Sequence, residues 1–255
     1  MVVLEENKGS RQVIGNPQLP FINSLAARYG LATNWFDLSH PSLPNYLGLT
    51  SGSIWDDPSD TSPQDRTYPG PSFVDQLSAR GIGWKAYIED MPRPCDLTDQ
   101  FDPEHYDVNH NPFVYYRSIR QSASRCNRVV PFQALAQDLS AGTAPPFMWV
   151  SPNLIHDMHD GTAAQADSWM SDLMNRVTAS RWWSQGGVVV LTWDESEDGD
   201  QIATIVVSSR LHHAVLSSRG DHYGTLRGLE EVYGVSLLGA AASPGHGDLR
   251  PLLAP

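Results

Sequence analysis

Carboxylate and amide side chains cluster in four short segments of this 255-residue sequence. The first and the fourth of these segments directly follow runs of apolar residues that are typical of buried strands. The four segments are Glu5-Glu6-Asn7, Glu89-Asp90, residues 153–160 and Asp194-Glu195. In an open α/β sheet, ligands bind beyond the carboxyl ends of the strands. We therefore expect the four segments to converge at one sheet edge and to form a site there, although a polar strand end is by itself common.

Four of these side chains predict a site for a hard metal ion. They are Glu6, Asn7, Asp194 and Glu195, and all of them offer oxygen donors. Such donors suit Mg²⁺, Ca²⁺ or Mn²⁺ better than Zn²⁺. The hydroxyl of Ser42 would add a further oxygen ligand and leave room for one oxygen of a substrate phosphate. We expect one divalent metal ion, held by oxygen ligands.

Ser42 is the candidate nucleophile. The pattern places it as the N-cap of a helix that has Pro44 in its first turn. A helix N-terminus attracts anions, and a metal ion beside a hydroxyl lowers its pKa and neutralises charge that develops on a phosphoryl group. The amide of Asn45, one turn away, could bind the same phosphate oxygens. Without the acidic segments, Ser42 would be interpreted only as a helix cap.

Several histidines could bind phosphate oxygens or protonate a leaving alkoxide. His110 and His159 are the strongest candidates, and His40 and His222 follow. His40 lies two residues before Ser42, which places it close to the candidate nucleophile. The alternative for each of them is a structural histidine that only forms hydrogen bonds.

The spacing of apolar residues predicts strands that alternate with helices. Strands are expected at residues 2–4, 31–36, 84–88, 147–151, 187–192 and 202–207, and helices at 20–29, 42–52, 73–79, 132–139, 163–179 and 223–233. The apolar run at 187–192 is typical of a central parallel strand that is covered on both faces. This alternation predicts one α/β domain over residues 1–255, built as a three-layer sandwich with a mostly parallel central sheet.

Two stretches break the alternation. Residues 53–71 are polar and rich in proline, as in a surface loop, and residues 91–130 are irregular and contain the only two cysteines, Cys95 and Cys126. Loops this long are usually functional or held in place. We interpret the cysteines as one disulfide that holds the long loop; the alternative is two free buried thiols. A disulfide indicates an oxidising compartment, and no leader peptide is visible.

The composition excludes some classes of partner. The formal net charge is −12, with 17 Lys and Arg against 29 Asp and Glu, so nucleic acid and anionic membranes are not expected as partners. The apolar runs are too short to cross a bilayer, and a soluble protein is expected. Carboxylate ligands of a metal ion would contribute to this negative charge. The oligomeric state is not specified by the sequence.

Several motifs resemble the bacterial phosphoesterase family of the alkaline phosphatase superfamily, which includes secreted acid phosphatases and phospholipases C. They are Val-Leu-Glu-Glu-Asn-Lys at residues 3–8, His-Pro-Ser-Leu-Pro-Asn-Tyr at 40–46, Tyr-Ile-Glu-Asp-Met-Pro at 87–92, His-Asn-Pro-Phe at 110–113, His-Asp-Met-His-Asp-Gly at 156–161 and Trp-Asp-Glu at 193–195. The resemblance extends over nearly the whole chain and implies an alkaline-phosphatase-like fold and a secreted protein.

The resemblance also implies roles for individual residues. In that family the Glu-Asn pair and the later acidic pair bind the metal, which corresponds here to the four ligands named above. The Ser-Leu-Pro-Asn-Tyr segment is similar to the Thr-Phe-Pro-Asn-His segment of nucleotide pyrophosphatases, whose threonine is the nucleophile. Ser42 would then form a phosphoserine intermediate, with Asn45, His110 and His159 as phosphate ligands.

Three functions are compatible with these features. The first is a metal-dependent phosphatase that acts on small phosphate monoesters or phospholipid head groups, with phosphoinositides among the possible substrates. The second is a phosphodiesterase of the phospholipase C type, because both reactions use the same nucleophile and metal. The third, from another class, is a non-catalytic surface-binding module. Such a module would have little use for an activated serine beside a metal site.

Overall fold

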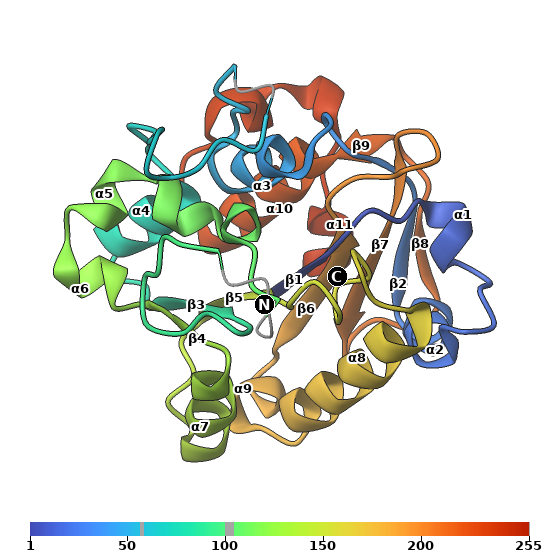
Figure 1. The fold of residues 1–255 in the computed structure, drawn as a ribbon. Helices are drawn as coiled ribbons and strands as arrows, with labels where there is room; N and C mark the ends of the chain where they lie inside the picture. The colour runs from blue at the N-terminus through green and yellow to red at the C-terminus, as the bar shows by residue number, and fades with distance from the viewer. Residues whose placement is uncertain (57–58, 100–104, 255) are drawn as a thin grey trace.

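The computed structural model describes residues 1–56, 59–99 and 105–254, so residues 57–58 and 100–104 of the two predicted loops lie outside it. Within the described residues, a nine-stranded sheet forms the centre of the fold (Figure 1), in the order β4-β3-β5-β1-β6-β7-β2-β8 with β9 beside β2. The strands are β1 (Val2–Glu5), β2 (Gly30–Phe36), β3 (Trp84–Ile88), β4 (Val129–Pro131), β5 (Phe147–Ser151), β6 (Val188–Trp193), β7 (Gln201–Ser208), β8 (Ala214–Leu216) and β9 (Gly220–Asp221).

The sheet is mostly parallel, as the sequence predicts. Only β7 runs against its neighbours β6 and β2, while the other described pairs are parallel. The connection from β6 to β7 is short enough for an antiparallel hairpin, whereas parallel neighbours need a longer crossover. β1 lies between β5 and β6 and is buried along its whole length. The first strand of the chain therefore lies inside the sheet rather than at its edge.

Helices cover both faces of the sheet and give the predicted three layers. Figure 1 shows α3, α4 and α10 on one side and α2, α7, α8 and α9 on the other. These helices are α2 (Pro20–Arg28), α3 (Ser42–Ser51), α4 (Phe73–Ala79), α7 (Gln133–Ala141), α8 (Ala163–Thr178), α9 (Arg181–Ser184) and α10 (His222–Tyr233). In α8, the buried residues Met170, Leu173 and Val177 recur at helical spacing, so one face of the helix packs on the sheet. Four further short helices lie near the two ends of the sequence: α1 (Ser10–Val13), η3 (Gly239–Ala242), η4 (Pro244–His246) and α11 (Arg250–Leu253).

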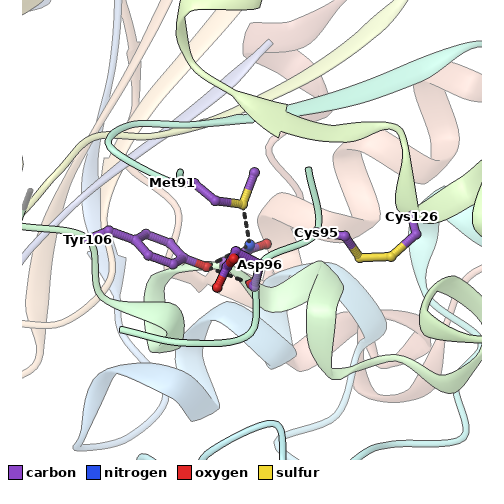
Figure 2. The surroundings of a disulfide bond; sticks show 6 residues. Met91, Cys95, Asp96, Tyr106 and Cys126 are labelled. Carbon is purple, nitrogen blue, oxygen red and sulfur yellow. Dashed lines mark hydrogen bonds between the residues drawn. A yellow bond between two sulfur atoms is a disulfide. The ribbon is translucent and has the colours of Figure 1, made fainter. Parts of the chain in front are cut away.

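The stretch at 91–130 is more regular than predicted. Its described part contains η1 (Val108–His110), η2 (Pro112–Tyr115), α5 (Arg117–Arg120) and α6 (Ala123–Cys126), and it ends in β4. These elements are too short to produce a clear periodicity in the sequence. The predicted disulfide between Cys95 and Cys126 is present (Figure 2). The loop is therefore held at both of its ends, by the disulfide and by the pairing of β4 with β3.

One local prediction needs correction. Ser42 is the first residue of α3, and the N-cap is Pro41, which has no side-chain capping group. The prediction of Ser42 as the N-cap is therefore wrong by one position, and its hydroxyl is free to point away from the helix backbone. The tyrosines at 68, 115 and 116 are buried in the core.

Candidate active site

The ends of β1 and β6 bring the first and last acidic segments together. The strands pair in the register Glu5 with Trp193, and the backbone N–H of Asp194 donates to the Glu5 carbonyl at 2.9 Å. Asn7 follows in a left-handed conformation (φ 58°), which asparagine adopts more readily than most residues. Its backbone N–H donates to Asp194 Oδ1 at 3.0 Å. Glu6 and Asp194 are thus fixed beside each other by the sheet itself.

Ser42 lies against Glu6. Its hydroxyl donates to Glu6 Oε2 at 3.1 Å, and both residues are buried, with Ser42 only 6% exposed. The serine is positioned by α3, all of whose residues are buried. The backbone N–H of the next residue, Leu43, donates to Oδ1 of Asp60 at 2.9 Å. The candidate nucleophile therefore stands at a helix N-terminus, with a carboxylate on one side and backbone N–H groups on the other.

Tyr46 and His110 complete the surroundings of Glu6. The Tyr46 hydroxyl donates to Glu6 Oε1 at 2.6 Å, and its ring stacks on that of His110 at a centroid distance of 5.4 Å. His110 Nε2 lies 3.3 Å from Glu6 Oε1, and His110 Nδ1 lies 3.3 Å from Asp157 Oδ2. Ligand atoms of Glu6, His110 and Asp157 all lie within 4.8 Å of one another. These three buried residues form a candidate metal-binding group that contains one nitrogen donor.

Glu195 lies at the more exposed side of the site. Asn45 Nδ2 donates to its Oε2 at 3.3 Å, and His40 Nδ1 lies 3.3 Å from its Oε1. Asn45 also ties the segment before α3 to the helix, because its Oδ1 accepts from the backbone N–H groups of Leu38 and Ser39. The site thus includes Glu195, Asn45 and His40, with Asn45 serving largely to position the chain around Ser42.

The remaining two predicted histidines lie in different surroundings. The side chain of His159 is 38% exposed, contacts Asp160, and has its ring 5.9 Å from the ring of His110. His222 is fully buried, and its Nε2 lies 2.6 Å from the backbone oxygen of Asp194. Burial lowers the pKa of His222, so a neutral ring donates this hydrogen bond. His159 is thus partly exposed beside His110, whereas His222 supports the chain behind Asp194.

The electrostatics of the site are dominated by close carboxylates. Burial raises the pKa of Glu6 well above its usual value, and the Asp194 carboxylate raises it further. Burial and Asp194 likewise raise the pKa of Glu195 to about 8. Burial disfavours the charged form of His110, but Glu6 and Asp157 outweigh this effect and raise its pKa well above the usual value. The positive charge of His110 alone does not balance the negative charge of the surrounding carboxylates. Each carboxylate therefore makes ionisation of its neighbours less favourable.

These features fit a divalent cation. Asp194 Oδ2 is buried and has no hydrogen-bond partner among the described residues. A buried carboxylate oxygen without a partner is costly unless it is paired with a cation or coordinates a metal. Donors brought together at the site include the oxygens of Glu6, Ser42, Asp157, Asp194 and Glu195 and the nitrogens of His110, while Asn7 contacts Asp194 through its backbone N–H. Hard oxygens dominate this set, although the imidazole makes it more mixed than the sequence predicts.

The sequence did not identify every residue that this geometry brings together. Tyr46, Asp60 and Asp157 were not among the candidates, although Asp157 lay in one of the four polar segments. Another of those segments does not join the site in the predicted way: Glu89 accepts from Asn153 N and Trp169 Nε1 and contacts His156. Only the His-Asp-Met-His-Asp motif carried a signal for Asp157, because it places two histidines beside the acid.

Residues 6–236 match the Phosphoesterase family, a span that includes all the site residues described above. The chain belongs to this family. It is therefore a phosphoric ester hydrolase by class, and the predicted enzyme class is confirmed.

Curated relatives of this phosphoesterase include several phosphatases. The phosphatidylinositol-3-phosphatase of Mycobacterium tuberculosis is 30% identical over 247 residues, which cover 95% of this chain and 79% of the relative. The acid phosphatase of Aspergillus niger is 26% identical over 84% of this chain, and the phosphate-repressible acid phosphatase of Penicillium chrysogenum is 25% identical over 86%. The chain spans 54% and 55% of these two fungal enzymes, about half of their length.

Solved structures confirm the predicted fold of this phosphoesterase. An alkaline phosphatase superfamily protein from Vibrio parahaemolyticus aligns with a TM-score of 0.60 and 12% identity, covering 97% of this chain and 68% of its own. The phosphonate monoester hydrolase of Agrobacterium radiobacter aligns with a TM-score of 0.61 and 12% identity, covering 99% and 76%. At this level of identity the similarity establishes the fold alone.

Proposed function

We propose that this chain is a metal-dependent phosphomonoesterase of the acid phosphatase type, with Ser42 as its nucleophile. The observation that carries the proposal is the hydrogen bond from the Ser42 hydroxyl to the buried carboxylate of Glu6, at the N-terminus of α3. A buried serine between an acceptor for its proton and an anion-attracting helix end has the arrangement of an activated nucleophile. The names of the curated relatives support the same reaction class.

The metal would be held by residues around Glu6. The ligand set that we propose is Glu6, Asn7, Ser42, Asp194 and Glu195, and the group of Glu6, His110 and Asp157 offers further donors beside it. A bound divalent cation lowers the pKa of a coordinated hydroxyl and neutralises charge on a phosphoryl group. The excess of oxygen donors favours Mg²⁺, Ca²⁺ or Mn²⁺ over Zn²⁺.

Individual side chains have different roles in the two steps of the proposed hydrolysis. Glu6 orients the Ser42 hydroxyl and takes its proton as the serine oxygen attacks phosphorus, so that the ester P–O bond breaks and a phosphoserine forms. Water next attacks the phosphoserine and releases phosphate. His159 lies on the exposed side of His110, where an imidazole can bind phosphoryl oxygens or protonate the departing alkoxide. Asn45 and His40 contact Glu195, and His222 supports the backbone of Asp194.

The proposed substrate is a small phosphate monoester or the phosphorylated head group of a phosphoinositide. Support for the head group comes from the name of the mycobacterial relative. Among the described residues, no helix is long and apolar enough to span a membrane. The Cys95–Cys126 disulfide supports an extracellular location, because disulfides persist in oxidising compartments.

The test compares p-nitrophenyl phosphate with bis(p-nitrophenyl) phosphate, each with and without a chelator. We expect faster turnover of the monoester, loss of activity with the chelator, and recovery on addition of Mg²⁺, Ca²⁺ or Mn²⁺. A preference for the diester would indicate a phosphodiesterase of the phospholipase C type instead. If neither substrate is turned over with metal present, both enzyme hypotheses fail, and the non-catalytic binding module is the hypothesis that remains.

A serine variant tests the mechanism. We expect Ser42→Ala to lower kcat by about a thousandfold or more, as for the loss of other nucleophilic serines. The matched control is Ser51→Ala, since Ser51 is also buried in α3 but donates to the Leu47 carbonyl and not to a site residue. Full activity in Ser42→Ala would exclude the proposed nucleophile and leave the enzyme class intact.

A further inference from the structure

The N-terminus of α3 is already occupied by an anionic group of the protein. The N-cap residue Pro41 has no side chain that could accept from the first turn, and Pro44 has no backbone N–H. The N–H of Leu43, adjacent to the candidate nucleophile, donates to Asp60 Oδ1 at 2.9 Å. A carboxylate from a residue 17 positions later thus covers one of the few N–H groups that this helix end can offer to a ligand.

Asp60 is unlike an ordinary helix cap in its surroundings. It is exposed to solvent, so it can leave the helix end without opening the core. Negative groups surround it: Asp107 and Asp194 disfavour its charged form, and Asp60 in turn disfavours the charged form of Glu195. His110 is the group that favours its charge. The carboxylate therefore sits at an anion-attracting position inside a site that otherwise repels it.

From this arrangement we propose that Asp60 is a specificity-determining residue, an internal anion that competes with the substrate's phosphoryl group for the N–H at the start of α3. The inference rests on the proposed phosphatase function. An N–H held by a carboxylate oxygen is not free for a phosphoryl oxygen, so binding requires that Asp60 be displaced. Its negative charge also repels the phosphoryl group as it approaches. Both effects weaken the binding of dianionic phosphates, including the inorganic phosphate that the reaction releases.

The pH dependence of this competition has a definite sign. The Asp60 residue is exposed as a whole, but its carboxyl is partly desolvated at the helix end, which raises its pKa above the usual value, although the Leu43 hydrogen bond acts in the opposite direction. As pH rises through this pKa, Asp60 becomes charged and the competition increases, so KM for a monoester rises. Asp107, His110, Asp194 and Glu195 are the other charged or titratable groups that act on the same region. The contribution of Asp60 is therefore measured as the difference between wild type and variant at each pH.

Two substitutions separate the charge of Asp60 from its hydrogen bond. Asp60→Asn removes the charge and keeps an oxygen that can accept from Leu43, while Asp60→Ala removes both. The matched control is Asp167→Asn. Asp167 also comes from a distant segment and accepts from two backbone N–H groups at the start of a helix, those of Phe21 and Ile22 in α2. That helix lies on the other face of the sheet from α3 (Figure 1).

The experiment measures kcat and KM for p-nitrophenyl phosphate, Ki for inorganic phosphate, and the thermal midpoint of every variant. We expect KM and Ki to fall about tenfold in Asp60→Asn near neutral pH, because one unit charge is removed within a few ångströms of the phosphoryl group. Asp60→Ala is expected to lower them at least as much, with kcat close to wild type. Asp167→Asn is expected to change the thermal midpoint and leave KM and Ki unchanged.

Several outcomes would overturn the inference. Unchanged or weaker phosphate binding in both Asp60 variants, together with a lower thermal midpoint, would make Asp60 only a helix cap. A large fall in kcat at constant KM would instead place Asp60 in the chemical step. The proposed function fails separately, if the wild-type protein hydrolyses no phosphate ester. An active wild type with an inactive Ser42→Ala and unaltered Asp60 variants would refute the competition alone.

Discussion

Replacing Tyr46 by phenylalanine tests whether the Glu6 carboxylate is held in place for a metal ion. The change removes one buried hydroxyl, which donates to Glu6 Oε1 at 2.6 Å, and retains the ring that stacks on His110. A hydrogen bond to a charged group contributes about 1.5–3 kcal/mol. A loss of about 2 kcal/mol corresponds to a roughly thirtyfold change in an equilibrium constant. Groups that orient metal ligands have effects of about 10–100-fold on metal affinity or activity, in agreement with this figure.

The assay is activity as a function of free metal concentration, after removal of metal with a chelator. We expect Tyr46→Phe to raise the half-saturating metal concentration by about thirtyfold and to recover most of the wild-type kcat at saturation. Tyr116→Phe is the control. Tyr116 is equally buried. Its hydroxyl lies 2.6 Å from Oγ1 of Thr50, which belongs to α3 like Tyr46, and among the described residues it makes no hydrogen bond with Glu6.

The two variants must differ for the reasoning to hold. Both are expected to lower the thermal midpoint, because each removes a buried hydrogen bond. Only Tyr46→Phe is expected to change the dependence on metal. If its metal titration coincides with that of Tyr116→Phe, the hydrogen bond to Glu6 has no part in metal binding, and the assignment of Glu6 as a ligand loses its support.

Two further predictions concern stability. Glu230 is buried in α10, and burial raises its pKa from 4.5 to about 8. Between these two pH values the folded protein binds a proton that the unfolded chain does not bind. The free energy of unfolding therefore falls as pH rises through this window. Glu230→Gln keeps an acceptor for the backbone N–H of Leu238 and should stabilise the protein by about 2 kcal/mol above pH 8 and by almost nothing below pH 4.5. This figure is roughly half of the free energy that the full pKa shift would give, because solvent screens the charge. Denaturant unfolding at both ends of this pH window measures the effect, and destabilisation of the variant at high pH would contradict the prediction. The Cys95–Cys126 bond closes a loop across a separation of 31 residues, so Cys95→Ser with Cys126→Ser is expected to cost about 4 kcal/mol in the loop-entropy model. The same fall should follow reduction of the wild type, and unfolding that is insensitive to reductant would show that the bond does not form.

Much of the fold follows from local patterns in the sequence. The predicted bounds of β3, α4 and β5 agree with the structure, because each is an apolar or amphipathic run ended by glycine, proline or polar residues. The meeting of Glu6 with Asp194 also follows from strand order, since parallel neighbours end at the same edge. These predictions need only the periodicity of side chains and the geometry of a parallel sheet.

The parts that the sequence did not reveal depend on how loops close over the strand ends. Asp157 is brought to Glu6 by a backbone hydrogen bond from Glu6 N to the Asp157 carbonyl, and Asp60 reaches α3 from a polar loop. Neither contact has a periodic signal. His222 shows the opposite problem: its residue type indicated chemistry, but burial places it behind the Asp194 backbone. Residue type alone does not distinguish a histidine that touches substrate from one that supports the chain.

The inner position of β1 has a consequence for how the protein acquires activity. β1 precedes both of its partners, β5 and β6, which lie in the second half of this sequence. The hydrogen bond from Asn7 to Asp194 spans 187 residues, so no N-terminal fragment ending before β6 can contain the site. Contacts of such high sequence separation form slowly, because the chain must lose much entropy before they form. The site can therefore form only after β1 has been enclosed between β5 and β6, so we expect catalytic activity to appear late in folding.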